Sequence, residues 1–224
     1  SFNDVIDDSD EQTHSPYFFV GYSAPSPSCS GMPTNKVFLK VWKADEVKTR
    51  SVETEWMHYK QAYDAGVPVA APAQQEVAKS TSSWGWQYLI IAVEYLHQDA
   101  IRTVDDLVQF CYSLVDTVDK LHKQSKLLHC DLKPDNIRWS DKVVRLIDFG
   151  HAQSIGCARS RRSTKGYEAP EIVKDMPCST QTDAFSVGKT ILYQLQRLHD
   201  KTIQQCQVYD VLNDVAVNLS LIHI

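Results

Sequence analysis

The sequence predicts an α+β fold of two lobes, a small one rich in β-strands and a larger one that is mainly helical. In the first half of the chain, apolar residues alternate with polar ones or form short runs, as they do in strands. In the second half they recur three and four positions apart, as on one face of a helix. Strands that precede helices, rather than alternating with them, indicate the α+β class. We place an acidic segment at 1–16, the small lobe at 17–96 and the larger lobe at 97–224.

Composition narrows the class of protein. The chain has 224 residues, of which 43% are hydrophobic, enough for a sizeable core. Its net charge of −5 argues against general nucleic-acid binding, which needs a basic surface. We expect no membrane span, because no apolar run reaches the length that one requires. Six scattered cysteines without a C-x-x-C pair favour reduced thiols and an intracellular protein, cytoplasmic or nuclear.

The small lobe is built from three predicted strands and one helix. We expect residues 1–16 to be disordered, because they are acidic and polar. The strands 17–23, 36–42 and 86–96 are indicated by alternating or continuous apolar residues, and the loop 24–35 by its proline and serine content. A helical pattern covers about 48–65 and stops at Gly66 and Pro68.

The larger lobe opens with the strongest helical pattern in the chain. Thr103 is a suitable cap for a helix whose apolar stripe runs from Val104 to Leu121. Short strands are expected at 136–139 and 143–149, and a further helix at about 181–199.

Four polar side chains in this lobe point to chemistry. Asp131, Lys133 and Asn136 lie on a loop between the long helix and a short strand, and Asp148 follows the next strand. A carboxylate and an amide oxygen brought together by a hairpin suit Mg²⁺. A second carboxylate can orient or accept a proton, and a lysine offsets phosphate charge. These are the groups that phosphoryl transfer requires.

The order of the motifs resembles that of the protein kinase family. The family pattern H-R-D-L-x-x-x-N corresponds to residues 129–136, D-F-G to 148–150 and A-P-E to 169–171. The segments 163–171 and 183–188 are similar to the regions that follow in that family. The resemblance implies a bilobal kinase-like fold and an enzyme that transfers the γ-phosphate of ATP to serine or threonine of a protein substrate.

Roles follow from the resemblance residue by residue. It implies that Asp131 orients the substrate hydroxyl and acts as base, and that Lys133 contacts the transferred phosphoryl group. Asn136 and Asp148 would bind Mg²⁺. Thr164 is similar to the threonine of the serine/threonine branch. Asp183 would brace the catalytic loop.

The nucleotide would be held by residues of the small lobe. Lys40 matches the strand lysine that grips the ATP phosphates. Its partner is a helix glutamate, for which we favour Glu55, with Glu53 as the alternative. Val93 would be the gatekeeper, and Glu94 to Leu96 the hinge whose backbone binds adenine.

The sequence departs from the family pattern at two places in the small lobe. No G-x-G-x-x-G loop precedes Lys40, and the upstream Gly21 and Gly31 are separated by a loop rich in proline and serine. Phe38 stands where the family has an alanine above the adenine ring. We therefore expect this phenyl ring to crowd the nucleotide pocket.

A third departure lies at the end of the chain. The family adds several helices after the one at 181–199, and one of them supplies an arginine that pairs with the glutamate of A-P-E, here Glu171. Few residues remain for such helices, so we expect an incomplete larger lobe.

The sequence leaves two other functions open. Phe38 and the missing glycine-rich loop favour a kinase-like scaffold or binding module without productive nucleotide binding. The segment 66–72 is similar to small-molecule kinases of the same superfold, although 163–171 belongs to kinases of peptide substrates. The sequence indicates neither the substrate nor the oligomeric state.

Cys130 replaces the arginine of H-R-D, which in the family often pairs with a phosphate on the activation segment. Because a cysteine cannot make that ion pair, we predict activity that is independent of phosphorylation of this segment. Treatment with a phosphatase should leave phosphate transfer unchanged, and its loss would contradict the prediction.

Overall fold

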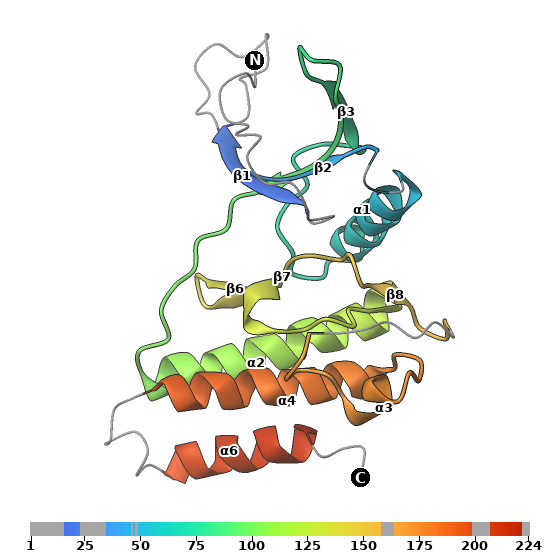
Figure 1. Cartoon of the computed structure of the whole chain (residues 1–224). Coiled ribbons are helices and arrows are strands. Elements are labelled where there is room, and N and C mark those ends of the chain that lie inside the picture. Colours follow the sequence, from blue (N-terminus) through green and yellow to red (C-terminus); the bar gives the residue numbers. More distant parts are fainter. Residues whose placement is uncertain are drawn as a thin grey trace.

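Figure 1 shows a small sheet with one helix above a stack of longer helices, which confirms the α+β prediction. The computed structural model describes residues 16–22, 35–45, 47, 49–157, 164–198 and 207–220. The predictions made for 1–15 and for 23–34 lie outside these described residues.

The upper lobe is built on a four-stranded antiparallel sheet of order β1-β2-β4-β3. Its strands are β1 (Tyr17–Tyr22), β2 (Lys36–Lys43), β3 (Ala78–Thr81) and β4 (Gln87–Glu94). The alternation predicted for β2 is present: Val37, Leu39 and Val41 pack with Tyr88 on one face, and Trp42 joins the main core on the other. Lys40 therefore points from β2 toward the rest of the molecule.

Helix α1 (Thr49–Asp64) packs against the face of this sheet that turns toward the lower lobe. Residues spaced three and four apart (Val52, Trp56, Tyr59) are buried, which is the reason this segment forms a helix here. The helix ends before Gly66, whose φ of 77° is the left-handed conformation that glycine adopts at little cost.

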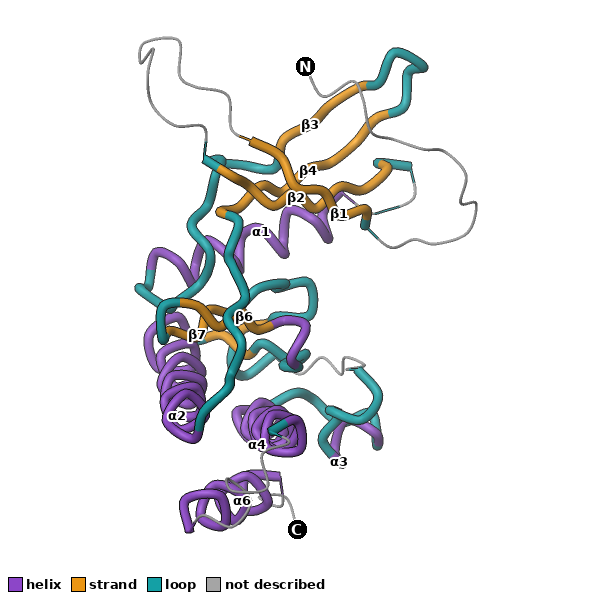
Figure 2. Tube along the Cα trace, turned by 90° about the vertical axis from the view of Figure 1, so that its left-hand side faces the viewer, coloured by secondary structure: helices purple, strands orange, loops and turns teal. Residues whose placement is uncertain are grey.

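The lower lobe is a stack of helices (Figures 1 and 2). Its members are α2 (Val104–Lys120), the π-helical turn η1 (Leu121–Ser125), α3 (Pro170–Val173), α4 (Thr180–Arg197) and α6 (Gln207–Ser220). Thr103 and Asp106 form a capping box on α2, as Thr103 predicted. Among the described residues, no helix is both long and apolar enough to cross a membrane.

Short strands lie between the two lobes. They are β5 (Leu127–Leu128) paired with β8 (Gln153–Ser154), and β6 (Ile137–Ser140) paired with β7 (Val143–Leu146), with the 3₁₀ turn η2 (Pro134–Asn136) before β6. Helix α2 supports the β6–β7 hairpin: Val144 donates its N–H to Ser113 Oγ and accepts from Thr117 Oγ1. This fixes the loop that carries Asp131.

Hydrogen bonds outside the hinge also join the two lobes. Leu146 donates its N–H to Pro68 O at 3.0 Å, and Val69 pairs with Leu146 as a parallel bridge. Gln61 on α1 donates to Ser125 O at 2.7 Å. One hydrophobic cluster runs through both lobes.

Several boundaries differ from the prediction. The strand expected at 143–149 ends at Leu146, because Asp148 has a φ of 63°, which no strand accommodates. Strand β3 and helix α6 were not predicted. All four residues of β3 are exposed, so they lack the apolar alternation that reveals a strand.

Glu171, for which the family pattern implies an arginine partner, accepts a hydrogen bond from Thr182 Oγ1 at 2.8 Å. Thr182 lies in the first turn of α4, so this bond connects α3 to α4.

Leu114→Ala should lower the free energy of unfolding by about 2–5 kcal/mol. Leu114, on α2, is fully buried in the hydrophobic core, and its truncation leaves a cavity there. Val115, the next residue, is 46% exposed. Val115→Ala is the matched control and should change stability by less than about 0.5–1 kcal/mol. Chemical denaturation measures both, and equal losses would contradict the packing described here.

Candidate active site

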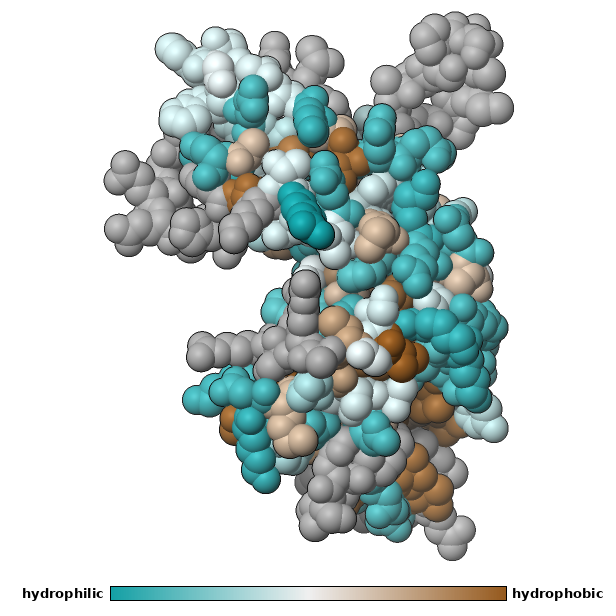
Figure 3. Space-filling view, turned by 90° about the vertical axis from the view of Figure 1, so that its right-hand side faces the viewer, coloured by the Kyte–Doolittle hydropathy of each residue, from teal (hydrophilic) through white to brown (hydrophobic). Residues whose placement is uncertain are grey.

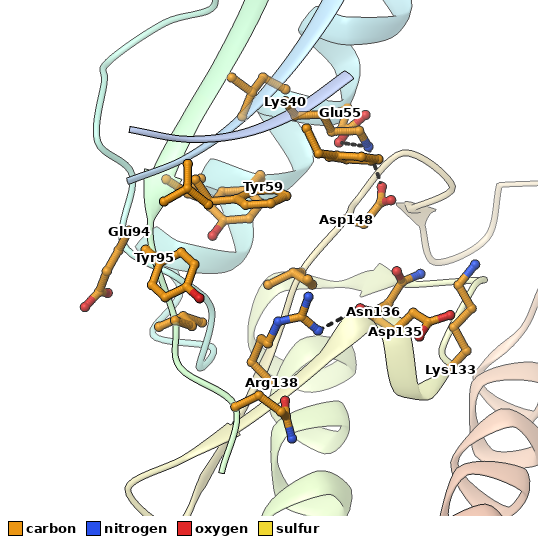
Figure 4. Close-up of a pocket in the computed structure, with 18 residues that line it drawn as sticks. Lys40, Glu55, Tyr59, Glu94, Tyr95, Lys133, Asp135, Asn136, Arg138 and Asp148 are labelled. Atoms are coloured by element: carbon orange, nitrogen blue, oxygen red, sulfur yellow. Dashed lines mark hydrogen bonds and ion pairs between the residues drawn. The ribbon is translucent and has the colours of Figure 1, made fainter. Parts of the chain in front are cut away.

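A cavity of about 800 Å³ lies between the lobes, where the outline of the molecule is indented in Figure 3. Apolar walls face a set of charged and polar side chains (Figure 4). The lining consists of Phe18, Val20, Phe38, Lys40, Glu55, Tyr59, Ile91, Val93, Glu94, Tyr95, Leu96, Gln98, Lys133, Asp135, Asn136, Arg138, Ile147 and Asp148.

Lys40 is the centre of the charged group at one end of the cavity. Its Nζ lies 2.9 Å from Glu55 Oε1 and 2.8 Å from Asp148 Oδ1. Glu55, the glutamate favoured from the sequence, is thus the partner of Lys40, and Glu53 is exposed on the other side of α1. One ammonium thus joins a strand, a helix and the loop after β7.

Burial and pairing act in opposite directions on these groups. Burial lowers the pKa of Lys40, but the charges of Glu55 and Asp148 outweigh it, so the pKa is raised overall. For Asp148, burial raises the pKa, and the charge and hydrogen bond of Lys40 bring it below its usual value. For Glu55, burial dominates the opposing charge of Lys40 and raises the pKa to about 7. Lys40 and Asp148 are therefore charged at neutral pH.

The backbone at Asp148 is strained, and a hydrogen bond from Gly150 helps to stabilise it. Its left-handed backbone (φ 63°) costs a non-glycine residue of order 1–3 kcal/mol. The N–H of Gly150 donates to Asp148 Oδ1 at 3.2 Å. A Cβ at position 150 would lie 3.1 Å from Glu55 Oε2 and 3.2 Å from Asp148 Oδ1, so glycine permits the close approach of these carboxylates.

An aromatic column supports the same segment. Trp56 stacks on Tyr59, Tyr59 meets the edge of Phe149 at 5.2 Å, and Phe149 lies 5.3 Å from His129, measured between ring centroids. Phe149 is fully buried. Helix α1, the loop after β7 and the loop before β6 are therefore packed through a single series of rings.

Asp131 is held by hydrogen bonds to both carboxylate oxygens. Thr164 donates its N–H (3.0 Å) and Oγ1–H (2.7 Å) to Oδ1. Asn136 Nδ2 lies 3.0 Å from Oδ2, and Lys133 Nζ lies 3.1 Å from it. Burial raises the pKa of Asp131, but the bonds from Thr164 and Lys133 leave it below the usual value. The carboxylate is ionised and fixed in orientation.

Asp183 fixes the backbone just before Asp131. This carboxylate is fully buried on α4 and accepts the N–H groups of His129 and Cys130, both at 2.9 Å. His122 Nε2 lies 2.8 Å from it. Cys130 has a φ of 63°, and the bond to its N–H stabilises this conformation.

The oxygen atoms left at the charged end suit a magnesium ion. Asn136 Nδ2 donates to Asp131 O and Oδ2, which leaves its Oδ1 as the remaining acceptor. Asp148 receives Lys40 and Gly150 on Oδ1, and among the described residues no hydrogen bond or ion pair involves its Oδ2. No group of three or more carboxylate, histidine or cysteine ligands occurs among the described residues. Mg²⁺ does not require one, because it keeps several waters and takes phosphate oxygens as ligands.

The other end of the cavity is apolar and includes the chain between the lobes. Leu96 has an N–H that donates to no group of the described residues. Phe38, expected to crowd the pocket, stacks on Phe18 with ring centroids 5.6 Å apart. Both rings line the cavity without filling it. The crowding is thus partial.

The structure brings together the residues that the sequence predicted for the site. All but Asp131 line the cavity, and Asp131 is bonded to two residues that do. Their roles remain predictions. The sequence did not predict that Phe18 and Arg138 line the cavity, or that Thr164 holds Asp131. Phe18 and Arg138 belong to no family motif, so the pattern of residues in their strands was the only signal for their place.

The sequence profile of the protein kinase domain matches residues 82–213, more than half of the chain. The chain belongs to the protein kinase family. The match includes the loop of Asp131, the segment of Asp148 and helix α4, whereas Lys40 and Glu55 lie outside it.

Curated relatives agree with this family. The serine/threonine-protein kinase TIO of Arabidopsis thaliana is 36% identical over 107 residues, which cover 46% of this chain and 8% of that protein. The G-type lectin S-receptor-like serine/threonine-protein kinase SD2-2 of the same plant is 42% identical over 72 residues (30% and 9%). The smooth muscle myosin light chain kinase of Gallus gallus is 31% identical over 99 residues (42% and 5%). The matched part spans less than a tenth of each of these relatives.

Glu55 should make the stability of this kinase domain depend on pH. Its pKa is about 7 when folded and near 4.5 when exposed, so the folded state binds its proton more tightly. The resulting stabilisation is fully present below about pH 4.5 and is lost as the pH rises through about 7. The difference in unfolding free energy between the wild type and Glu55→Gln should therefore decrease over this range.

Denaturant titrations at several pH values measure this difference. Glu53→Gln is the matched control, because it makes the same chemical change on the exposed side of the same helix, away from Lys40. A pH-independent difference for Glu55→Gln would contradict the prediction, because it would mean that folding leaves the pKa of the carboxyl unchanged.

Proposed function

We propose that this chain is an active protein kinase that transfers the γ-phosphoryl group of ATP to a serine or threonine hydroxyl of a protein substrate, with Mg²⁺. The observation that carries the proposal is the convergence on one cavity of Lys40, Asp148, Lys133 and Asn136, with Asp131 bonded to the last two. These are the positioning and charge-stabilising groups on which phosphoryl transfer depends.

In this proposal the nucleotide lies along the cavity from its apolar end to its charged end. The free N–H of Leu96 donates to the base, and Val93 and Ile147 contact it. Lys40 binds phosphate oxygens while Glu55 keeps its ammonium at the required position. Because the Lys40–Glu55 bond already exists, little reorganisation is needed when the phosphates arrive.

The protein hydroxyl meets the phosphorus beside Asp131. Thr164 Oγ1–H donates to Asp131 Oδ1 at 2.7 Å, and this is the kind of bond that a substrate hydroxyl would make there. The new O–P bond forms as the bond from the γ-phosphorus to the β–γ bridging oxygen breaks. The hydroxyl proton passes to Asp131, and ADP leaves.

Lys133 and the cation share the charge of the transferred group. Lys133 Nζ lies near both Asp131 and Thr164, where it can approach the phosphoryl oxygens. When bound, Mg²⁺ offsets phosphate charge, and Asn136 Oδ1 and Asp148 would be its protein ligands. Because its pKa is lowered, Asp131 is a weak base and acts chiefly by orienting the hydroxyl. This role fits a loose transition state, in which the hydroxyl needs little activation.

A second candidate is a kinase-like scaffold that does not transfer phosphate. One observation favours it: the stacked rings of Phe18 and Phe38 narrow the cavity at its roof. The two candidates differ in a measurable way, since a scaffold would show no transfer that depends on Asp131.

Asp131→Asn should lower kcat/KM for phosphate transfer by about 10²–10⁴-fold, because the carboxylate that orients the hydroxyl and takes its proton is lost. Asp148→Asn should lower it at least as much, since Asp148 is both a partner of Lys40 and a candidate Mg²⁺ ligand. Transfer of labelled phosphate from ATP to a generic basic protein measures this, and thermal shift with Mg·ATP reports binding.

Asp141→Asn is the matched control. Asp141 lies in the exposed β6–β7 turn with a φ of 53°, a conformation that asparagine also tolerates. Its kcat/KM should equal that of the wild type. Transfer that is unchanged in both site variants, or no binding at millimolar ATP, would defeat the enzyme proposal. Binding without transfer would support the scaffold.

A further inference from the structure

The outer face of the upper sheet, opposite α1, is apolar along three strands. On this face lie Tyr17 and Phe19 of β1, Val37, Leu39 and Val41 of β2, and Tyr88, Ile90 and Ala92 of β4. Among the described residues, this cluster contains none from a helix, and α1 packs on the other face (Figures 1 and 2). An antiparallel sheet with one face in water usually carries polar side chains there. The composition of this outer face therefore indicates that it is covered.

The central side chains of the outer face are nearly inaccessible. Leu39, Val41 and Tyr88 are only 5–6% exposed. By contrast, Phe18 and Val20, on the cavity side of β1, are 55% and 50% exposed. Burial of the first kind normally needs a second layer of structure, and the described helices and strands place none on this face.

One end of the outer face carries a cation and an indole. Lys43 lies on the same side of β2 as Val41 and pairs with Tyr88. Its Nζ is 5.5 Å from the centroid of the Trp86 ring, and Trp86 is 47% exposed. Bonds within the β3–β4 turn hold Trp86, which accepts from the N–H of Ser82 at 2.8 Å and donates to Ser82 Oγ at 3.1 Å. This end of the face is therefore rigid and positively charged.

Strand β1 begins at this same end of the sheet. Tyr17 pairs with Val41, two residues before Lys43. Pro16 precedes Tyr17, and the chain leaves the sheet there because a proline cannot donate to the ladder. The fifteen residues before Pro16 could extend over about 50 Å. The outer face from Lys43 to Val37 is only about 20 Å long, so these residues can reach all of it.

Residues 1–15 match the outer face in charge and in polarity. Their acidic residues are Asp4, Asp7, Asp8, Asp10 and Glu11, and they include no lysine or arginine. Their aliphatic and aromatic residues are Phe2, Val5 and Ile6. Going back from Pro16, the chain thus offers most of its carboxylates first and its apolar side chains afterwards. The outer face has the same order, with Lys43 next to the start of β1 and the apolar cluster beyond it.

We propose that residues 1–15 dock on the outer face of the upper sheet, with their carboxylates near Lys43 and their apolar side chains on the apolar cluster. A segment so rich in charge cannot form a core of its own, and the sheet supplies the apolar surface that it lacks. The inference concerns a surface away from the cavity and does not depend on phosphate transfer. Because β1 follows the segment directly, docking also holds the strand whose Phe18 and Val20 line the cavity.

Photocrosslinking in the full chain tests this contact. Trp86 is replaced by the photoreactive p-benzoylphenylalanine, which keeps an aromatic side chain at the edge of the outer face. After irradiation, digestion with chymotrypsin separates residues 1–15 from 23–34, because it cleaves after Tyr17 and Tyr22, and mass spectrometry identifies the joined peptide. We expect residues 1–15 of the same molecule. The same replacement at Tyr63 is the matched control, since Tyr63 is 44% exposed but lies on α1, and it should give no such product.

Substitutions on both sides of the contact refine the test. Lys43→Gln should lower the crosslinking yield by about 1.4- to 5-fold, the effect of losing one exposed ion pair. Lys79→Gln should leave it unchanged, because Lys79 is exposed on the same sheet but pairs with Leu89, whose side chain belongs to the opposite face. Ile6→Ser should lower the yield, and Ser9→Ala should not. Thermal unfolding checks that each variant folds.

Each other outcome overturns the inference in its own way. Crosslinks to residues 23–34 would assign the outer face to the loop between β1 and β2. Crosslinked dimers on a denaturing gel would assign it to a second copy of the chain. No product, or a yield that neither Lys43→Gln nor Ile6→Ser lowers, would mean that residues 1–15 do not dock on this face.

Discussion

The ammonium of Lys40 is the group on which the arrangement of the site depends. Carboxylate oxygens of Glu55, on α1, and of Asp148, in the lower lobe, both lie within 2.9 Å of its Nζ. The same atom therefore fixes the position of one helix and of one loop. Without it, the carboxylates of Glu55 and Asp148 would repel each other. Packing carries the constraint further, since Tyr59, one turn after Glu55, contacts Phe149, next to Asp148. Charge and packing thus impose the same relative placement of α1 and the loop.

The lower lobe holds the loop that carries Asp131 in a strained conformation. Asp183 accepts the N–H groups of His129 and Cys130 and so directs the chain into Asp131. The carboxylate is fully buried, and its bonds offset the cost of removing it from water. Asp131 itself is then fixed by Thr164, Asn136 and Lys133. Cys130 and Asp148, on the two loops that carry the site, both have the left-handed backbone conformation that is costly for a non-glycine residue.

The sequence predicted those parts of the structure whose signals are local. The helical pattern over about 48–65 placed Glu55 on a helix as the favoured partner of Lys40, and the motif around Asp131 indicated a loop with the groups for phosphoryl transfer. It did not predict contacts that depend on how distant segments meet. Thr164 lies 33 residues from Asp131, and nothing in its vicinity indicates that it would donate two bonds there. Arg138 alternates like any strand residue, so its place in the cavity emerged only from the pairing of β6 with β7. Strand β3 had no buried face to reveal it.

The bonds that join the lobes away from the hinge also limit how the domain can move. Leu146 is bonded to Pro68, and Gln61 to Ser125, on the side of the molecule where α1 meets the lower lobe. If these bonds persist, sliding of one lobe over the other is blocked, and a rotation about an axis near them is the motion of lowest cost. The chain that joins the lobes lies at the opposite, apolar end of the cavity, where Tyr95 and Leu96 are part of the lining. The cavity is therefore bounded by covalent continuity at one end and by hydrogen bonds between the lobes at the other, and the second set is the one that can break and re-form.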